Sequence, residues 1–293
     1  MAKTITEGFQ KFLSNLEPLS SEQAKAKLHK GSVEGCLKNN FQCYKFEETG
    51  SIGNGTGIRH YSDTDYFASI PVEKLSTNSG TALRDVKSAL QYTFHKTKGI
   101  EVNTPAVLIP FGYYASENLE VTPSQFKGMI NTILGNFPLY LIPDGRGEWM
   151  QSSPKAHNKY VTTIDTKLRG KLKPLIQLIK AWKYMNDVPI ISFYLELRIT
   201  KLFENSIIFS YDEAVVEVLK HLYDKELSGI QDPMKVSGLI PATKTPNQRE
   251  TALSKLTTAL SRAEKAVAAR KKDKIDDTFN WWNKLFNENF PAR

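Results

Sequence analysis

The segment from Gly50 to Asp65 constrains this chain more than any other part of the sequence. A Gly-Ser pair, Gly50 and Ser51, precedes a glycine-rich stretch and then Asp63 and Asp65, which one residue separates. Side chains alternate between the two faces of a β-strand, so both aspartates are expected on one face. Neighbouring carboxylates repel each other unless a cation lies between them, and Mg²⁺ prefers carboxylate and phosphate oxygens. Because a Gly-Ser turn also offers N–H and hydroxyl donors to phosphate, the segment predicts a nucleoside triphosphate site with a divalent metal.

A third acid, Glu120, lies in a short apolar segment, Leu119–Pro123, that favours a strand. If this strand pairs beside the one that carries Asp63 and Asp65, three carboxylates converge. Three acids can hold two Mg²⁺ or Mn²⁺ ions, the arrangement used for in-line nucleotidyl transfer. The alternative is an acid on an edge strand that faces water.

Three residues in the second half of the chain are candidates for nucleotide binding. Lys180 flanks an apolar helical stripe, so its stem can lie along the core with its ammonium near a triphosphate; a plain surface lysine is the alternative. Ser192 opens a predicted helix, where it can cap the helix, contact phosphate or do both. Phe193 is either a core residue or a flat face on which a nucleobase stacks.

The hydrophobic pattern divides the chain into an α/β half, residues 1–161, and a helical half, residues 162–293. In the first half we expect helices over residues 4–44, and then strands and a further helix. These expected elements are Tyr44–Glu47, Thr64–Pro71, Ala106–Tyr114 and Asn118–Pro123 as strands, with Ser79–Thr97 as the helix. The segment after Pro123 is expected to be irregular. Beyond residue 162 the apolar residues recur at helical spacing.

Composition is that of a folded protein, with 40% hydrophobic and 24% charged residues in 293. No apolar run is long enough to span a bilayer, and the first residues lack the pattern of a secretory signal, so we expect a cytoplasmic protein without membrane contact. The net charge of +8 suits polyanionic partners. Seven basic residues against two acidic ones lie between Lys255 and Lys274, a pattern typical of a solvated helix face and, alternatively, of a nucleic-acid contact.

Several motifs together resemble one family. Gly50-Ser51, Gly-Thr-Gly-Ile and Ser-Asp-x-Asp are similar to the DNA polymerase β-type nucleotidyltransferase superfamily. The further motifs are Glu120-Val-Thr-Pro, Tyr140-Leu-Ile-Pro-Asp with Trp149, Ser153-Pro154 with His157, Lys180-Ala-Trp182, Ser192-Phe-Tyr-Leu-Glu196 and Trp281-Trp282 with Leu285-Phe286 and Phe290-Pro291. In this order they resemble the bacterial cyclic-oligonucleotide synthases called CD-NTases, relatives of cyclic GMP–AMP synthase and oligoadenylate synthase.

The resemblance implies an α+β fold: a polymerase β-like core with a mixed sheet and flanking helices, plus a C-terminal helical lobe, separated by a central cleft. It assigns Asp63, Asp65 and Glu120 to two metal ions and to catalysis. It assigns the donor nucleotide to five residues: Gly50, Ser51, Lys180, Ser192 and Phe193. The third acid is aspartate in many relatives, and the longer glutamate here changes reach without changing charge.

The activity implied by the resemblance is Mg²⁺-dependent joining of nucleoside triphosphates into a cyclic second messenger. ATP, GTP and pyrimidine triphosphates are the substrates to consider, and RNA or a protein partner is a candidate activator. The biological setting implied is bacterial antiphage (CBASS) defence. Two alternatives share the motifs: a linear nucleotidyltransferase acting on RNA, protein or a small molecule, and an inactive nucleotide- or RNA-binding scaffold.

Overall fold

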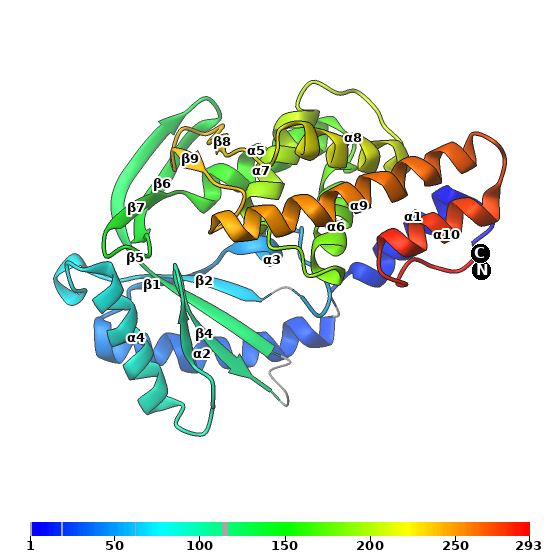
Figure 1. Cartoon of the computed structure of the whole chain (residues 1–293). Helices are drawn as coiled ribbons and strands as arrows, with labels where there is room; N and C mark the ends of the chain where they lie inside the picture. The colour runs from blue at the N-terminus through cyan, green and yellow to red at the C-terminus, as the bar shows by residue number, and fades with distance from the viewer. Residues whose placement is uncertain (1, 19, 62, 113–116) are drawn as a thin grey trace. The chain divides into compact units, whose positions relative to one another are not determined.

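The computed structural model describes the whole chain except residues 1, 19, 62 and 113–116 (Figure 1). Ser62 of the Ser-Asp-x-Asp motif and the last two residues of the strand expected over 106–114 therefore lie outside the described residues. The chain divides into two compact units. The sheet unit comprises Pro18–Lys159 and Met234–Ser237, and the helical unit comprises Met1–Glu17, Tyr160–Pro233 and Gly238–Arg293.

A seven-stranded mixed sheet is the centre of the sheet unit. Its strands are β1 (Lys45–Glu48), β2 (Thr64–Ser69), β3 (Glu101–Asn103), β4 (Ala106–Phe111), β5 (Glu117–Thr132), β6 (Gly135–Pro143) and β7 (Trp149–Ser152). The order β1-β2-β5-β4-β3 runs across the sheet, and β6 joins the far half of β5 to β7. β2 and β5 run parallel, whereas the other neighbours are antiparallel.

Two helices, α2 (Ser20–Phe41) and α4 (Ser79–Thr93), pack on one face of this sheet. The expected helix from Ser79 is confirmed, and it begins after Asn78, whose side chain caps the N–H of Thr81. Leu83, Val86 and Leu90 are buried against the strands, as their spacing predicts. The short elements α3 (Gly50–Asn54) and η1 (Val72–Lys74) complete the unit.

The segment expected to be irregular is regular strand. β5 continues from Pro123 to Thr132 and turns into β6, with a register shift between Phe126 and Gly128. Gly128 has a φ of 125°, a value that side chains disfavour and that a β-bulge accommodates at glycine. Phe126 and Met129, in the outer half of β5, are apolar but exposed. The apolar residues of this segment therefore do not mark a buried face, and the sequence lacks the alternation of apolar and polar residues that identifies a half-buried strand.

Seven helices extend into the helical unit or lie wholly in it. They are α1 (Ile5–Leu16), α5 (Pro154–Lys167), α6 (Leu172–Met185), α7 (Ser192–Phe203), α8 (Tyr211–Asp224), α9 (Pro246–Arg270) and α10 (Ile275–Leu285). A two-stranded ribbon, β8 (Ile230–Gln231) with β9 (Leu239–Ile240), accompanies them. None of the described helices combines the length and apolar character that a transmembrane span requires.

The first helix is placed differently from the sequence-based division. The pattern assigns residues 1–161 to one domain, whereas α1 packs against α6, α8 and α10 of the helical unit. Phe9 meets Trp282 with ring centroids 5.0 Å apart, and Phe12 meets Phe286 at 4.5 Å. The apolar stripe of α1 is recognisable from the sequence. Its partners lie at the far end of the chain, and the periodicity within one helix does not indicate which distant residues it packs against.

Candidate active site

Parallel pairing of β2 and β5 brings two of the predicted acids together. Asp65 lies directly opposite Glu120 in the register, and Tyr66 lies opposite Val121. Residues directly opposite each other in neighbouring strands project to the same face. Tyr66 and Val121 are buried in the core beneath α2 and α4, so Asp65 and Glu120 share the other face of the sheet. The expected pairing of these strands is therefore present.

Asp63 precedes β2 by one residue and contacts β5 through a hydrogen bond from Asn118. Asn118 lies two residues before Glu120 and so shares its face of the strand. Burial raises the pKa of Asp63 above its usual value, and the hydrogen bond from Asn118 offsets part of that rise. Asp63 is thus a half-buried carboxyl group whose ionised form is made less favourable by burial.

Glu120 has a neutral partner of its own. Asn103 Nδ2, from β3, donates a hydrogen bond of 2.7 Å to Glu120 Oε1. Among the described residues, no three His, Cys, Asp or Glu side chains are gathered in an arrangement ready to hold a metal ion. The backbone register thus brings Asp65 and Glu120 together, while the carboxylates of Asp63 and Glu120 each turn to an amide.

Gly50 lies against Asp65 and has a structural reason to be glycine. The N–H of Thr49 donates to the carbonyl of Asp65 at 2.8 Å, which brings the start of α3 beside β2. Gly50 has a φ of 63°, and a Cβ atom there would lie 2.8 Å from the Cβ of Asp65 and closer still to its carboxylate. The Gly-Ser pair, expected to be a turn, opens the short helix α3, and the Ser51 carbonyl accepts the N–H of Thr56 at 2.9 Å.

In the helical unit, Lys180 is a core residue. Its side chain is 0% exposed, and Nζ lies 3.0 Å from Glu196 Oε1 of α7. The alternative of a plain surface lysine is therefore wrong. The stem lies along the core as expected, and the ammonium has a carboxylate beside it. This buried ion pair couples α6 to α7.

Ser192 is the first residue of α7, and the N-cap position belongs to Ile191. The capping alternative is therefore wrong, because the Ser192 hydroxyl faces α6. Lys183 Nζ donates to Ser192 Oγ at 2.8 Å, and Tyr184 OH shares a hydrogen bond with the same oxygen at 3.1 Å. Burial, followed by the neighbouring charge of Lys180, lowers the pKa of Lys183 to about 8.

Lys183 is a candidate that sequence reasoning missed. It lies three positions after Lys180 on α6, and residues at that spacing are neighbours on one helix surface. That spacing was the available signal, but the partner serine comes from the next helix. Phe193, beside Ser192, is 36% exposed, so it is not one of the buried core residues.

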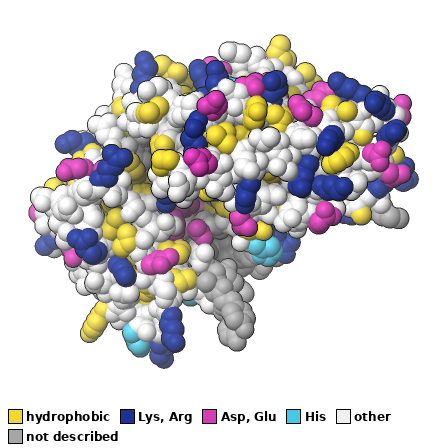
Figure 2. Space-filling model, in the orientation of Figure 1, with side chains coloured by type: hydrophobic (Ala, Val, Ile, Leu, Met, Phe, Trp, Pro, Cys, Tyr) yellow, Lys and Arg dark blue, Asp and Glu magenta, His cyan; other side chains and the backbone are white. Residues whose placement is uncertain are grey.

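Several basic side chains of the stretch between Lys255 and Lys274 make contacts within the protein. Lys255 Nζ donates to the carbonyls of Asn186 and Asp187. Arg262 donates to a carbonyl in α10, and Arg270 pairs with Asp212 and Glu213 of α8. Figure 2 shows acidic side chains mixed with the basic ones over the visible face of these helices. This distribution favours a solvated helix face over a nucleic-acid contact.

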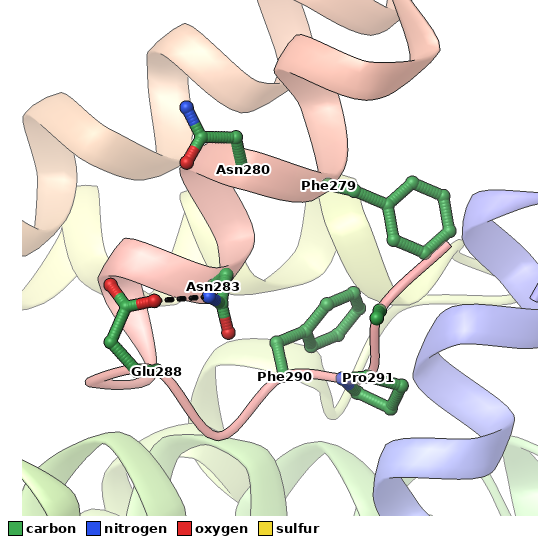
Figure 3. Close-up of a pocket in the computed structure, with 7 residues that line it drawn as sticks. Phe279, Asn280, Asn283, Glu288, Phe290 and Pro291 are labelled. Atoms are coloured by element: carbon green, nitrogen blue, oxygen red, sulfur yellow. Dashed lines mark hydrogen bonds between the residues drawn. The ribbon is translucent and has the colours of Figure 1, made fainter. Parts of the chain in front are cut away.

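A separate hollow of about 440 Å³ lies beside α10 in the helical unit (Figure 3). Phe279, Phe290 and Pro291 line it, and Asn283 donates a hydrogen bond to Glu288 there. None of the predicted site residues lines this hollow.

A curated protein and several solved structures are similar to this chain. A probable cyclic nucleotide synthase from Bacillus cereus strain VD146 is 23% identical over 157 residues, which cover 52% of this chain and 46% of that protein. The match thus spans about half the length of this relative.

Solved structures match nearly the whole chain. Escherichia coli MS115-1 CdnC, solved with ATP, is 18% identical, with a TM-score of 0.74 over 98% of this chain and 99% of that one. Bradyrhizobium diazoefficiens CdnG, a CD-NTase in complex with GTP, is 13% identical, with a TM-score of 0.71 over 99% and 96%. The Vibrio cholerae cyclic AMP-GMP synthase DncV, with a linear intermediate, is 13% identical, with a TM-score of 0.66 over 98% and 88%. These likenesses show a shared fold and confirm the expected α+β architecture.

The sequence also matches a described protein family. The match spans residues 3–164, more than half of the chain, and its description is the Second Messenger Oligonucleotide or Dinucleotide Synthetase domain. This span includes β2 and the part of β5 that carries Glu120. The chain therefore belongs to the Second Messenger Oligonucleotide or Dinucleotide Synthetase family.

Proposed function

We propose that this protein is a nucleotidyltransferase that joins nucleoside triphosphates into a cyclic di- or trinucleotide. The 3′- or 2′-hydroxyl of one nucleotide attacks the α-phosphate of another. A new phosphorus–oxygen bond forms, the bond to the β-phosphate breaks, the hydroxyl loses its proton and pyrophosphate leaves. A second round closes the ring. The observation that carries this proposal is the parallel register that sets Asp65 opposite Glu120, in a chain of this family.

Asp63, Asp65 and Glu120 are proposed as the catalytic acids and the ligands of two divalent cations, Mg²⁺ or Mn²⁺. The donor set fits, because all three residues offer the hard carboxylate oxygens that Mg²⁺ prefers. Asp63 is half-buried, and the group that lowers its pKa is the neutral amide of Asn118. Such ions, when bound, activate the attacking hydroxyl and neutralise the departing pyrophosphate. Closing the cluster requires side-chain rotation, because the three carboxylates are not yet gathered.

The nucleotide contacts proposed are Gly50, Ser51, Lys180, Ser192 and Phe193, joined by Lys183. Lys183 and Ser192 offer an ammonium and a hydroxyl 2.8 Å apart, both suited to phosphate oxygens. Phe193 offers a partly exposed ring for a base. ATP and GTP are proposed as substrates because relatives of this fold were solved with them. The sheet unit then corresponds to the nucleotidyltransferase core and the helical unit to the C-terminal lobe.

The setting proposed is cytoplasmic antiphage signalling of the CBASS type, in which the product activates an effector. A protein activator is supported by the relative CdnC, which was solved in a complex with HORMA-deltaN. RNA is the other candidate activator, and a salt-dependent binding assay distinguishes it from a solvated basic helix. Absence of RNA binding at low salt would remove the RNA candidate.

A linear nucleotidyltransferase is the alternative activity, and an inactive scaffold is the alternative without chemistry. The purified chain is incubated with each pair of radiolabelled triphosphates and Mg²⁺ or Mn²⁺, then treated with phosphatase and chromatographed. A phosphatase-resistant product supports ring closure, and a product that phosphatase degrades supports the linear reaction. A well-folded chain that gives no product under any combination, with or without candidate activators, supports the scaffold.

The double variant Asp63→Ala with Asp65→Ala tests the assignment of the acids. We expect it to abolish all product while circular dichroism and thermal unfolding show an intact fold, because neither aspartate belongs to the hydrophobic core of the sheet unit. Undiminished turnover in this variant would refute the assignment.

A further inference from the structure

Two asparagines contact the carboxylates of the proposed metal site. Asn118 of β5 hydrogen-bonds Asp63, and Asn103 of β3 donates to Glu120 at 2.7 Å. The two amides come from different strands and reach different acids. Neither residue is part of the sequence motifs named above.

The sheet topology places Asn118 beside the site. It precedes Glu120 by two residues on the same face of β5, a separation of roughly 7 Å along a strand. Asp65 lies opposite Glu120, and Asp63 is reached from Asn118 itself. Asn103, at the end of β3, approaches Glu120 across the intervening strand β4, which pairs with both β3 and β5.

An amide can orient a carboxylate without neutralising it. An arginine or lysine in the same place would supply the positive charge that a divalent ion would otherwise bring. An ionised carboxylate offers about four lone-pair positions, and one N–H uses one of them. The amide contact by itself therefore leaves the charge of each acid in place.

Asn118 offers a second, independent observation. Its Oδ1 is buried and has no hydrogen-bond partner among the described residues. Buried carbonyl oxygens are rarely left without a donor, and an unpaired one in a native structure calls for a water, an ion or a ligand. Because the amide nitrogen faces Asp63, the free oxygen is held beside the same acid.

We infer that Asn118 and Asn103 are positioning residues that restrain the carboxylates of Asp63 and Glu120 beside Asp65 without neutralising them, so that side-chain rotation brings the three acids onto divalent cations, with Asn118 Oδ1 accepting from cation-bound water. This inference rests on the proposed metal site and adds two residues to it. Hydrogen-bonded partners of metal ligands typically change metal affinity 10–100-fold when they are removed.

The test measures Mn²⁺ binding to the full chain by electron paramagnetic resonance, without nucleotide. We expect Asn118→Ala and Asn103→Ala each to weaken Mn²⁺ affinity by roughly 10–100-fold. In steady-state assays the metal concentration for half-maximal activity rises by a similar factor, while kcat at saturating metal stays within about threefold of the wild type. Asn131→Ala is the matched control, since it removes an exposed asparagine farther along β5 and leaves Mn²⁺ binding unchanged.

Asn103 is exposed, so we expect Asn103→Ala to fold, and this variant still tests the inference if Asn118→Ala does not fold. Asn118→Leu, similar in size and without an N–H donor, is the second variant at that position, with the same expected loss. Unchanged or tighter Mn²⁺ binding in folded variants at either position overturns the inference for that residue. If instead the wild type and the Asp63→Ala, Asp65→Ala variant bind Mn²⁺ equally, the proposed metal site itself is wrong.

Discussion

At the scale of single residues, the candidate site depends on close packing as much as on charge. Gly50 makes room for Asp65, Asn118 and Asn103 fix the orientation of neighbouring acids, and Lys183 contacts Ser192. The acids themselves follow from the sequence, because alternation along a strand places Asp63 and Asp65 together. Their partners do not, since each comes from another element of the fold.

Gly50→Ala should reduce nucleotidyl transfer by at least about 100-fold. The new Cβ would overlap the Asp65 carboxylate, and the φ of 63° adds a strain of roughly 1 kcal/mol for a residue with a side chain. The measurement is initial rate against triphosphate concentration, with thermal unfolding as the check on folding. Gly53→Ala, in the same helix, is the control: its Cβ would meet nothing closer than the Glu48 carbonyl at 3.6 Å, so near wild-type rates are expected. Equal rates in both variants would contradict the proposed role of Gly50.

Triphosphate affinity should fall by roughly tenfold as the pH rises from about 7 to about 9. Lys183 has a pKa of about 8, so over this range it loses the charge that would form a charge-assisted hydrogen bond to phosphate. Lys183→Arg should remove this pH dependence, because a guanidinium stays protonated. The dissociation constant of a non-hydrolysable triphosphate analogue, measured by calorimetry at several pH values, checks both expectations.

Loss of folding would not explain that pH effect. The folded-state pKa of Lys183 lies below the value near 10.4 of an unfolded chain, so the folded state binds fewer protons between the two values. The contribution of this residue to the free energy of unfolding therefore increases as the pH rises from about 8 to about 10. A flat affinity profile in the wild type would exclude Lys183 as a phosphate contact.

At the scale of elements, helices were predicted more completely than strands. The helix from Ser79 follows from its apolar spacing and its cap at Asn78, both of which are local. β6, β7 and the outer half of β5 were missed because their exposed positions break the alternation that identifies strands. The contacts between elements could not be predicted from the local sequence pattern. For example, α6 and α7 meet through Lys180 and Glu196, whose pairing depends on helix packing.

Lys180→Met should lower the free energy of unfolding by about 3–5 kcal/mol, because it leaves Glu196 without its buried cation. Adding Glu196→Leu should restore most of that loss, since a buried ion pair can often be replaced by apolar side chains of similar volume. Urea unfolding of the two single variants and the double variant forms a double-mutant cycle. Additive losses in the double variant would show that the pair does not couple α6 to α7.

At the scale of the whole molecule, residues far apart in the chain build the helical unit. Phe9 and Phe12 of α1 pack on Trp282, Phe286 and Phe290 near the C-terminus. The N-terminal helix therefore belongs to the packing of the second half of the chain. This arrangement makes the two ends of the sequence interdependent in stability.

Phe9→Ala should destabilise the helical unit by about 3–5 kcal/mol, the usual cost of removing a buried aromatic ring. Hydrogen exchange measured by mass spectrometry should show faster exchange in α6, α8 and α10. Exchange in β2 and β4 should change less, because their core contains no residue of α1. Tyr92→Ala, at a residue that is 88% exposed, is the control and should leave exchange near wild type in both units. Uniform acceleration across both units in Phe9→Ala would contradict the separate packing of α1.

The sequence by itself determined which chemical groups this protein can offer and the local form of the segments that carry them. A Gly-Ser pair, alternating aspartates, a third acid in an apolar strand and amphipathic helices are properties of neighbouring residues, which strand alternation and helical periodicity express directly. The tertiary structure alone decided that Asp65 lies opposite Glu120, that Lys180 meets Glu196 and that Lys183 meets Ser192. Strand register and helix packing set these pairings, because they minimise the free energy of the packed unit as a whole and not that of any one segment.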